Sequence, residues 1–347
     1  MIRIIALTLI CAWLGDALHA AAPGTKVKPR PRDNVKVAKD HEKYIQGALK
    51  YMAAKQRPDG SWGESSEERR HPVAITGYTL IAFQAAGNLP GEGPYGRVVK
   101  KGMDYLLNQV GPDGIYGNRA SGQYMYAHGI ATIALAELYG QTRSPAIRGK
   151  LDRTIKLIIA SQNEQGGWRY RPVVRDADIS VTVLQVVALR AAKNSGIDVP
   201  QRTIDNAVKY VKACHHAGTG GFSYQPGSSP GFARTAAAIY SLQVCGLYDD
   251  PLVMKGSKYL FANHRESQEW YVYGNFYAAP AQYMIGGDTW EKWYKAIATT
   301  VVKSIRKEGD IYRWDSNGRG GVGPIYTTAV YTTMLAMPYH YLPLYQR

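Results

Sequence analysis

The chain has 347 residues, 45% of them hydrophobic, and a formal net charge of +15 at pH 7. After its first residues it has no uninterrupted apolar run long enough for a membrane helix, and no motif of a nucleic-acid-binding module, so neither class is expected. The positive charge suits acidic polysaccharides, phospholipid headgroups or phosphorylated ligands, and suits a merely solvated basic surface equally well.

The first 39 residues divide into two segments. Residues 1–22 have a basic start at Arg3, an apolar core and small residues at 20–22, which predicts a secretory signal peptide and export to the periplasm or beyond the cell. Residues 23–39 hold six basic residues and one acid, a net +5, and several prolines. We expect this segment to be a disordered basic linker.

A repeated segment organises the remainder, residues 40–347. Residues 56–63 (QRPDGSWG) are echoed by residues 162–168 (QNEQGGW), both with the pattern Gln, three residues, Gly, one residue, aromatic. Weaker copies place aromatic residues at related positions, so that the series reads Trp62, Tyr116, Trp168 and Phe222. The intervals of 54, 52 and 54 residues indicate a repeat architecture.

Each repeat contains two predicted helices around the Gly-rich turn. The first helix of each pair is amphipathic, in the ranges 44–52, 99–110, 151–159, 204–214, 253–264 and 290–306. The second is apolar almost all round, in the ranges 74–86, 130–138, 181–192, 235–244, 276–285 and 325–337. Since a helix without a polar face is buried, six exposed helices should surround six buried ones. The sequence therefore predicts an all-α fold, an (α/α)6 toroid that closes on itself.

The two turns at Gln56/Gly60/Trp62 and Gln162/Gly166/Trp168 resemble those of the prenyltransferase and squalene-oxidase repeat family, which includes the triterpene cyclases. The resemblance covers about residues 42–338 and implies a single terpenoid-cyclase-like toroid. It also implies that the turns are structural and tie neighbouring helices together. Activity is implied much less specifically, because one fold hosts many functions.

Two motifs of that family are incomplete in this chain. The cyclases that protonate an alkene use Asp-x-Asp-Asp, whereas residues 176–179 read DADI, which argues against that chemistry. The zinc-binding relatives use Asp, Cys and His, but no Asp-x-Cys precedes Cys214, His215 and His216. We therefore expect no metal and no cofactor. Cys214 and Cys245 end antiparallel helices of one pair, so we expect free thiols.

A functional site is expected where the buried helices begin. They all start on one face of the ring, and their N-termini favour anions. The candidates there are His71, Tyr124, Tyr126, His128, Asp176, Asp178, Ser180, Phe232, Arg234, Thr235, Tyr273, Asn275, Tyr277, Asp315, Tyr326 and Thr327. Of these, we predict catalytic roles for Asp176, Asp178, His128 and Tyr126. We predict ligand-binding roles for His71, Arg234, Asn275 and Tyr277.

Some candidates also have a structural interpretation. Asp178 or Ser180 suits the N-cap of its helix, and His128 suits a hydrogen-bonded core position. Arg234 suits an ion pair with Asp176 or Asp178.

Three functions remain open from the sequence. The first is an isoprenoid or other lipid ligand in a cavity of tyrosines, with Asp176 and Asp178 as acids. The second is an enzyme of acidic glycans. As a lyase it would use His128 and Tyr126, with Arg234 or Asn275 neutralising the uronate; as a hydrolase it would use Asp176, Asp178 and Asp315. The third is a non-enzymatic binding scaffold.

The composition and the cavity bear on this choice. The 26 tyrosines against 5 phenylalanines favour a more hydrophilic ligand than squalene. An apolar deep pocket would favour the lipid, an open polar cleft the glycan and a filled centre the scaffold.

Overall fold

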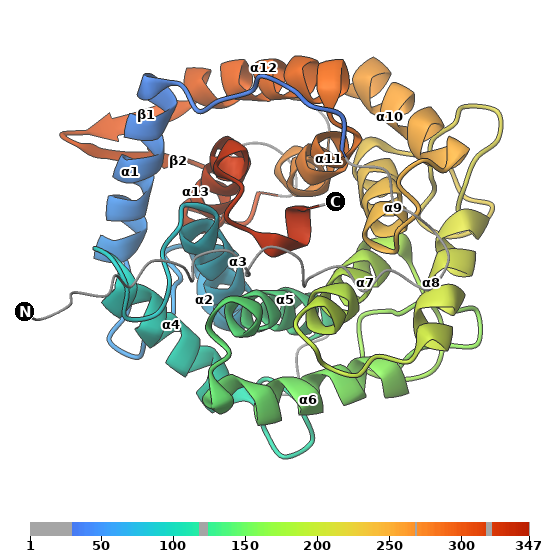
Figure 1. Cartoon of the computed structure of the whole chain (residues 1–347), viewed down its shortest axis with the longest axis horizontal. Helices are drawn as coiled ribbons and strands as arrows, with labels where there is room; N and C mark the ends of the chain where they lie inside the picture. Colours follow the sequence, from blue (N-terminus) through green and yellow to red (C-terminus); the bar gives the residue numbers. More distant parts are fainter. Residues whose placement is uncertain (1–29, 118–123, 268, 317–320, 347) are drawn as a thin grey trace, which may run out of the picture.

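The computed structural model describes residues 30–117, 124–267, 269–316 and 321–346. Two concentric rings of helices make up the fold (Figure 1). The outer ring consists of α1 (Lys39–Ala54), α4 (Gly96–Gln109), α6 (Pro145–Ala160), α8 (Gln201–Ala213), α10 (Pro251–Asn263) and α12 (Gly287–Lys303). The inner ring consists of α3 (Pro72–Ala85), α5 (Tyr124–Thr142), α7 (Ile179–Asn194), α9 (Phe232–Val244), α11 (Tyr271–Ile285) and α13 (Pro324–Ala336). The predicted (α/α)6 toroid is confirmed.

Burial follows the two hydrophobic patterns of the sequence. Helix α8 buries one face, including Ile204, Ala207 and Val211, and exposes Asp205 and Lys209. Helix α7 buries nearly every residue from Ile179 to Ala192. Because the inner helices are apolar on all sides, each one is stable only between two inner neighbours and its own outer helix.

The ring closes between its first and last units. Helix α13 packs beside α3, and the short helix α2 (Ser66–Arg70) bridges to the start of α13. The buried carboxylate of Glu68 accepts hydrogen bonds from the backbone N–H groups of Glu64, Ser65 and Tyr326, each at 2.9 Å. The Ser65 hydroxyl donates to the carbonyl of Val322 at 2.9 Å. One fully buried carboxylate therefore joins residues 258 positions apart.

Two of the repeated turns join their unit to the next through a glutamine side chain. The side-chain amide of Gln162 donates to Gly166 O within its own turn and to Thr203 O at the start of α8, both at 2.9 Å. Gln56 does the same with Gly60 O at 3.0 Å and Val98 O at 2.9 Å. Each glutamine thus satisfies one carbonyl of its own turn and one of the next outer helix.

The glycine of the turn permits this close approach. Gly166 has φ +94°, and a Cβ atom there would lie 2.1 Å from Asn206 O on α8. Only glycine combines this backbone conformation with such a contact.

The aromatic residue of the turn locks the outer helix to the inner helix of its own unit. The indole N–H of Trp168 donates to Ile158 O on α6 at 2.7 Å, and its backbone N–H donates to Thr182 Oγ1 on α7 at 3.1 Å. Trp62 and Trp314 repeat this geometry with their own helices. The expected structural role of the turns is confirmed by these bonds.

The last unit contains a hairpin that the sequence analysis did not predict. Strand β1 (Ile305–Glu308) pairs antiparallel with β2 (Ile311–Trp314), and Ile305 lies opposite Trp314. The Gly309-Asp310 pair between residues 305–308 and 311–314 was a readable signal for a two-residue hairpin. In the fifth unit, α11 begins at Tyr271, five residues before the predicted start, so the aromatic run there is helix and not turn.

Part of the predicted linker is ordered. Residues 30–38 run along α12 (Figure 1), whereas residues 23–29 and the predicted signal peptide lie outside the described residues. The guanidinium group of Arg30 lies 4.1 Å from the centre of the Tyr283 ring and donates to Tyr283 O at 3.2 Å. The N–H of Gly287 donates to Pro31 O at 3.3 Å. Residues 30 and 31 therefore have specific contacts with α11 and α12.

We predict that Trp168→Ala lowers the free energy of unfolding by about 3–5 kcal/mol, because it empties a fully buried site and removes the donor to Ile158 O. Phe261→Ala, at a side chain that is 41% exposed, is the matched control and should cost about 1 kcal/mol or less. Urea unfolding followed by circular dichroism measures both. Equal stabilities of the two variants would contradict the structural role of the turn.

We also predict two free thiols in the protein that begins at residue 23. Cys214 is buried and Cys245 half-buried, and neither is paired. Burial raises the pKa of both thiols to about 12, so the native protein should react slowly with a thiol reagent at pH 8. After denaturation without reductant both should react. A mass lower by two hydrogens, with no reactive thiol, would show a disulfide instead.

Candidate functional site

A polar cluster lies at the N-terminal ends of α5 and α7. The Tyr126 hydroxyl is 2.6 Å from Ser180 Oγ, and Ser180 Oγ donates to Asp178 Oδ1 at 2.6 Å. Because Ser180 gives its proton to Asp178, Tyr126 must be the donor in the first bond. The Tyr273 hydroxyl, from α11, donates to Ser180 O at 2.8 Å. Three inner helices are thus joined at one point of the ring.

Asp178 is the N-cap of α7. Its Oδ1 atom also accepts hydrogen bonds from the backbone N–H groups of Ser180 at 2.9 Å and Val181 at 3.0 Å. The side chain is fully buried, and its Oδ2 atom accepts no hydrogen bond from the described residues, with Arg169 Nε 3.5 Å away. Burial raises the pKa of Asp178 despite these donors, which is the reverse of the effect expected from the helix N-terminus.

Arg169 forms ion pairs with both Asp176 and Asp178. Its Nη1 atom lies 2.9 Å from Asp176 Oδ2, in addition to its contact with Asp178. Its guanidinium carbon lies 4.8 Å from the ring centre of Tyr170 and 5.7 Å from that of Tyr224. The predicted pairing of the aspartates with Arg234 is therefore wrong, since Arg169 takes that place.

Arg234 reaches the same cluster from α9. It donates to Ser229 O at 2.9 Å, and its guanidinium carbon lies 5.9 Å from the centre of the Tyr224 ring. The hydroxyl groups of Tyr170 and Tyr224 are hydrogen-bonded to each other, and the ring of Tyr170 stacks on that of Tyr126 at 5.9 Å. We call this set the mouth cluster: Tyr126, Arg169, Tyr170, Asp176, Asp178, Ser180, Tyr224 and Arg234.

The mouth cluster reaches solvent. The rings of Tyr126, Tyr170 and Tyr224 are half-buried, and the side chain of Asp176 is 55% exposed. Burial raises the pKa of Tyr126 and of Tyr224, so both hydroxyls stay protonated near neutral pH. The cluster therefore presents aromatic faces, hydroxyl groups, one exposed carboxylate and two guanidinium groups at one end of the inner ring.

His128 and Asn275 are predicted site residues that lie away from this cluster. His128 is fully buried between α5 and α6: its Nδ1 atom accepts from the Tyr124 hydroxyl at 2.8 Å, and its Nε2 atom donates to Thr154 O at 3.1 Å. Burial lowers the pKa of His128 to about 4, so it stays neutral. Asn275 is also fully buried and donates to Tyr271 O within its own helix at 2.9 Å. These contacts give both residues structural positions.

The other candidates have separate surroundings. His71, between α2 and α3, lies 3.2 Å from the Glu67 carboxylate. Asp315 pairs with Arg306 and Arg313 at 3.1 and 3.3 Å. Tyr277 is fully buried at the centre of the ring, with its ring 5.0 Å from that of Tyr273. Of the eight residues with predicted catalytic or ligand-binding roles, Tyr126, Asp176, Asp178 and Arg234 are the ones brought together in the mouth cluster.

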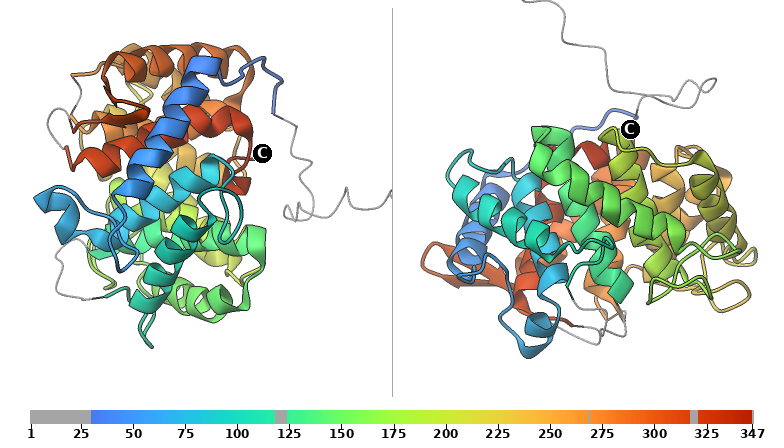
Figure 2. Two further views of the ribbon diagram at one scale, coloured as in Figure 1. Left: turned by 90° about the vertical axis from the view of Figure 1, so that its left-hand side faces the viewer. Right: turned by 90° about the horizontal axis from the view of Figure 1, so that it is seen from below.

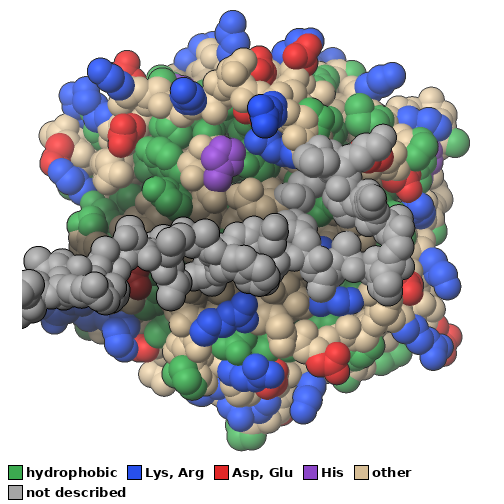
Figure 3. Space-filling model, in the orientation of Figure 1, with side chains coloured by type: hydrophobic (Ala, Val, Ile, Leu, Met, Phe, Trp, Pro, Cys, Tyr) green, Lys and Arg blue, Asp and Glu red, His purple; other side chains and the backbone are tan. Residues whose placement is uncertain are grey.

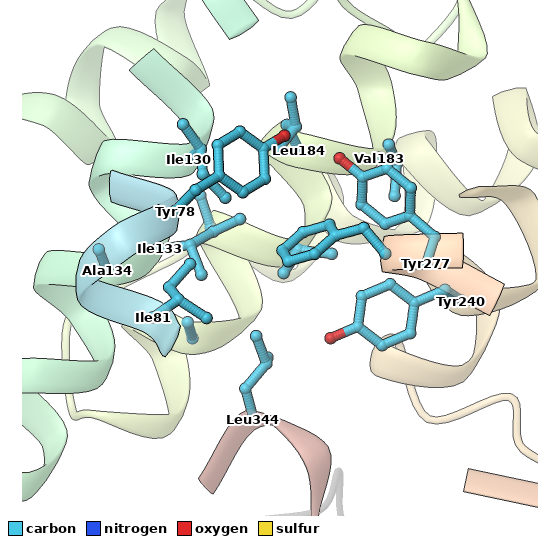
Figure 4. Close-up of a cluster of buried hydrophobic side chains, with 14 of the residues drawn as sticks. Tyr78, Ile81, Ile130, Ile133, Ala134, Val183, Leu184, Tyr240, Tyr277 and Leu344 are labelled. Carbon is cyan, nitrogen blue, oxygen red and sulfur yellow. The ribbon is translucent and has the colours of Figure 1, made fainter. Parts of the chain in front are cut away.

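The opposite end of the inner ring is filled by the C-terminal segment. Figure 2 shows the C-terminus and α2 at opposite ends of the ring. The short helix η2 (Pro343–Tyr345) inserts Leu344 and Tyr345 between the inner helices, and Figure 4 shows Leu344 below a cluster that includes Ile81, Tyr240 and Tyr277. The cavity left beneath it measures about 10 Å³, enough for about one water molecule.

The sequence analysis missed Arg169, Tyr170 and Tyr224 of the mouth cluster, and Glu137 beside the small cavity. Glu137 lines the small cavity from α5, and its Oε2 atom accepts from the Leu344 N–H at 3.1 Å. A lone acid inside the apolar run of residues 130–138 was a readable signal. Arg169 directly follows Trp168 of the repeated turn, but nothing in the pattern showed that it turns back toward Asp178.

The described residues contain no group of three or more His, Cys, Asp or Glu side chains placed to hold a metal ion. Among the described helices, none is long and apolar enough to cross a membrane.

No protein-family model and no curated protein matches the sequence. Solved structures of the same fold do match. One is an α-1,6-mannanase of glycoside hydrolase family 76 from Salegentibacter sp. HEL1_6 in complex with α-1,6-mannotriose, with TM-score 0.64, 8% identity, and coverage of 87% of this chain and 100% of that chain.

A cellobiose 2-epimerase from Bacillus thermoamylovorans matches with TM-score 0.62 and 13% identity, covering 84% of this chain and 97% of that one. A type II terpene cyclase from Scytonema, in complex with geranylgeranyl dihydroxybenzoate, matches with TM-score 0.56 and 12% identity, covering 87% and 98%. The chain therefore has the α/α-toroid fold found in both carbohydrate-active enzymes and terpene cyclases.

We predict that Glu137 makes stability depend on pH. Burial raises the pKa of Glu137 from 4.5 to about 7, so the folded protein retains a proton that the unfolded chain releases in this window. This contribution is fully present below pH 4.5 and is lost as the pH rises through 7. Relative to Glu137→Gln, the wild-type protein should thus lose on the order of 3 kcal/mol between pH 4 and pH 8. The free energies of unfolding are measured by urea titration at each pH. The same pH dependence for both proteins across this range would contradict the prediction.

Proposed function

We propose that the protein is an exported glycan-binding toroid whose ligand lies on the mouth cluster. The observation that carries this proposal is the stacked, half-buried pair Tyr126 and Tyr170 beside Arg169 and the exposed carboxylate of Asp176. Sugars offer apolar C–H faces that pack on aromatic rings, and hydroxyl groups that bond to carboxylates and guanidinium groups. The mouth cluster offers both kinds of surface within one site.

The filled centre of the ring counts against an isoprenoid ligand and is the outcome expected for a binding scaffold. A folded hydrocarbon ligand needs a deep apolar pocket, and the cavity of about 10 Å³ at the centre holds no more than a water molecule. The mouth cluster instead consists of hydroxyl-bearing rings and charged groups. The likeness in fold to a mannanase that binds mannotriose and to a cellobiose epimerase supports a glycan ligand, and the likeness to a terpene cyclase supports the isoprenoid alternative.

An acidic glycan is the favoured ligand class. The formal net charge is +15, and Lys and Arg side chains also surround the opposite end of the ring, which faces the viewer in Figure 3. Arg169 is already shared by Asp176 and Asp178, whereas Arg234 bonds to a backbone carbonyl and lies beside Tyr224. Arg234 is thus the guanidinium group with charge left to meet a uronate or sulfate on the ligand.

Hydrolysis is the catalytic form of this proposal that the geometry favours. A lyase using His128 has little support, because both ring nitrogens of His128 are engaged between α5 and α6. Asp176 is the exposed acid, and Asp178 is the buried one whose pKa is raised, which is the kind of contrast that a general acid needs.

We predict that an acidic oligosaccharide, such as oligogalacturonate, binds to the full chain in titration calorimetry more tightly than α-1,6-mannotriose does. Tyr170→Ala and Arg234→Ala should each weaken this binding at least about tenfold, roughly 1.4 kcal/mol. Tyr341→Ala, at an aromatic side chain that is 53% exposed near the C-terminus, is the matched control and should leave it unchanged.

Two outcomes would count against this proposal. The first is that the parent protein binds neither glycan while it binds a geranylgeranyl compound, which would favour the isoprenoid alternative. The second is that the mouth variants and the control bind the glycan equally. Release of reducing ends from the bound glycan, abolished by Asp176→Asn, would establish hydrolysis; binding without release would establish the non-enzymatic scaffold.

A further inference from the structure

The C-terminal segment turns back into the ring after α13. The chain continues from α13 through the short helix η1 (Met337–Tyr339), and His340, with φ +61°, reverses its direction. Leu342, Leu344 and Tyr345 are then buried, with 3–6% of their surface exposed, while Tyr341 points to solvent. We call residues 342–345 the plug.

The plug rests on five inner helices. The wall of the space that it fills comes from Ile81 on α3, Ile133 and Glu137 on α5, Val187 on α7, Tyr240 on α9, and Phe276 and Tyr277 on α11. The ring of Tyr345 lies 6.5 Å from that of Tyr240 in an edge-on arrangement. Figure 4 shows Leu344 directed from the plug toward this wall. The wall is apolar except for one carboxyl and the tyrosine hydroxyls.

Glu137 is the polar group that the fold itself does not explain. It is 3% exposed on an inner helix, and its hydrogen-bond partner from the plug is the Leu344 N–H. The titratable side chains that face it are Tyr240 from α9 and Tyr345 from the plug. A carboxyl buried among apolar groups costs stability, so a core built only for packing would carry an apolar residue at this position.

We propose that the plug is displaceable, and that the space beneath it is a binding site for an apolar molecule that carries one hydrogen-bond donor for Glu137. The plug shows what the site accepts: branched and aromatic side chains, and one N–H group aimed at a carboxyl. The matching ligand class is an apolar amide, amine or alcohol. This site lies at the C-terminal ends of the inner helices, and the mouth cluster lies at their N-terminal ends.

The closure of the ring does not depend on the plug. Helices α3 and α13 pack together directly, and Glu68 joins the first and last units at the other end of the ring. The base of the plug is held by the hydrogen bond between His340 Nδ1 and the Tyr283 hydroxyl. Arg30 of the N-terminal segment lies on the same tyrosine ring. In this proposal the plug moves out about His340 while the twelve helices of the double ring stay in place.

Hydrogen exchange on the full chain tests whether the plug opens. The Leu344 amide, which bonds to Glu137, should exchange at least about tenfold faster than the amides in the middle of α5, because local opening precedes global unfolding. Saturating N-phenyl-1-naphthylamine, an apolar probe with one N–H donor, should raise the amide exchange rates of the plug that it displaces. The rates in α6 and α8 should stay unchanged. Exchange of Leu344 at the same rate as α5, with and without the probe, would overturn the proposal.

Probe fluorescence on full-length variants tests the site itself. The double variant Leu344→Ala with Tyr345→Ala should bind one equivalent of the probe at least about tenfold more tightly than the parent. Adding Glu137→Leu should reverse most of that gain, and adding Ile133→Trp should abolish binding by filling the space. Circular dichroism is the control that checks whether each variant is folded. A folded double variant that binds no more tightly, or that binds equally well with Ile133→Trp, would also overturn the proposal.

This outcome is separate from that of the glycan proposal. Tyr170→Ala, in the mouth cluster, should leave probe binding unchanged, and the double variant of the plug should leave glycan binding unchanged. A failure at one end of the ring therefore leaves the result at the other end interpretable.

Discussion

The whole architecture depends on the hydrogen bonds that the repeated turn makes to the next unit. Gln162 gives one side-chain amide to two carbonyls, one in its own turn and one at the start of α8. Gly166 permits the approach, and Trp168 fixes the turn to α6 and α7. Since the inner helices are apolar on all sides, a misplaced unit would expose a hydrophobic helix to water. Spacing the units correctly is therefore the condition for burying the core at all.

A ring with all its inner helices parallel has two chemically different ends. At the N-terminal end, free backbone N–H groups need acceptors, and Asp178 and Glu68 supply them. Tyrosine hydroxyls and arginines extend that polar network to solvent. At the C-terminal end, the chain returns and fills the apolar centre of the ring with Leu344 and Tyr345. Without this segment the centre would be open to water. The glycan proposal and the plug proposal each follow from one of these ends.

Whether a predicted site residue lies in the mouth cluster depended on the direction in which its side chain points from its helix. Successive residues of an α-helix are rotated by about 100°, so residues two positions apart point in nearly opposite directions. Tyr126 faces the mouth cluster, and His128 consequently faces α6. The same rotation separates Tyr277, at the centre of the ring, from Asn275 on the same helix. The start of a helix was predictable from the sequence, whereas the face that looks into the ring was not.

The sequence by itself determined the number of units, the order of exposed and buried helices and the structural role of Trp62 and Trp168, because these follow from local periodicity and a fixed repeat. It also placed Tyr126, Asp176, Asp178 and Arg234 at one end of the ring. Only the tertiary structure decided that Arg169 pairs with the aspartates, that Glu137 meets Leu344 and that the C-terminus fills the centre. Glu137 and Leu344 are 207 positions apart, and Arg169 meets Asp176 and Asp178 through the irregular segment between α6 and α7 of its own unit. No periodic pattern specifies either kind of contact.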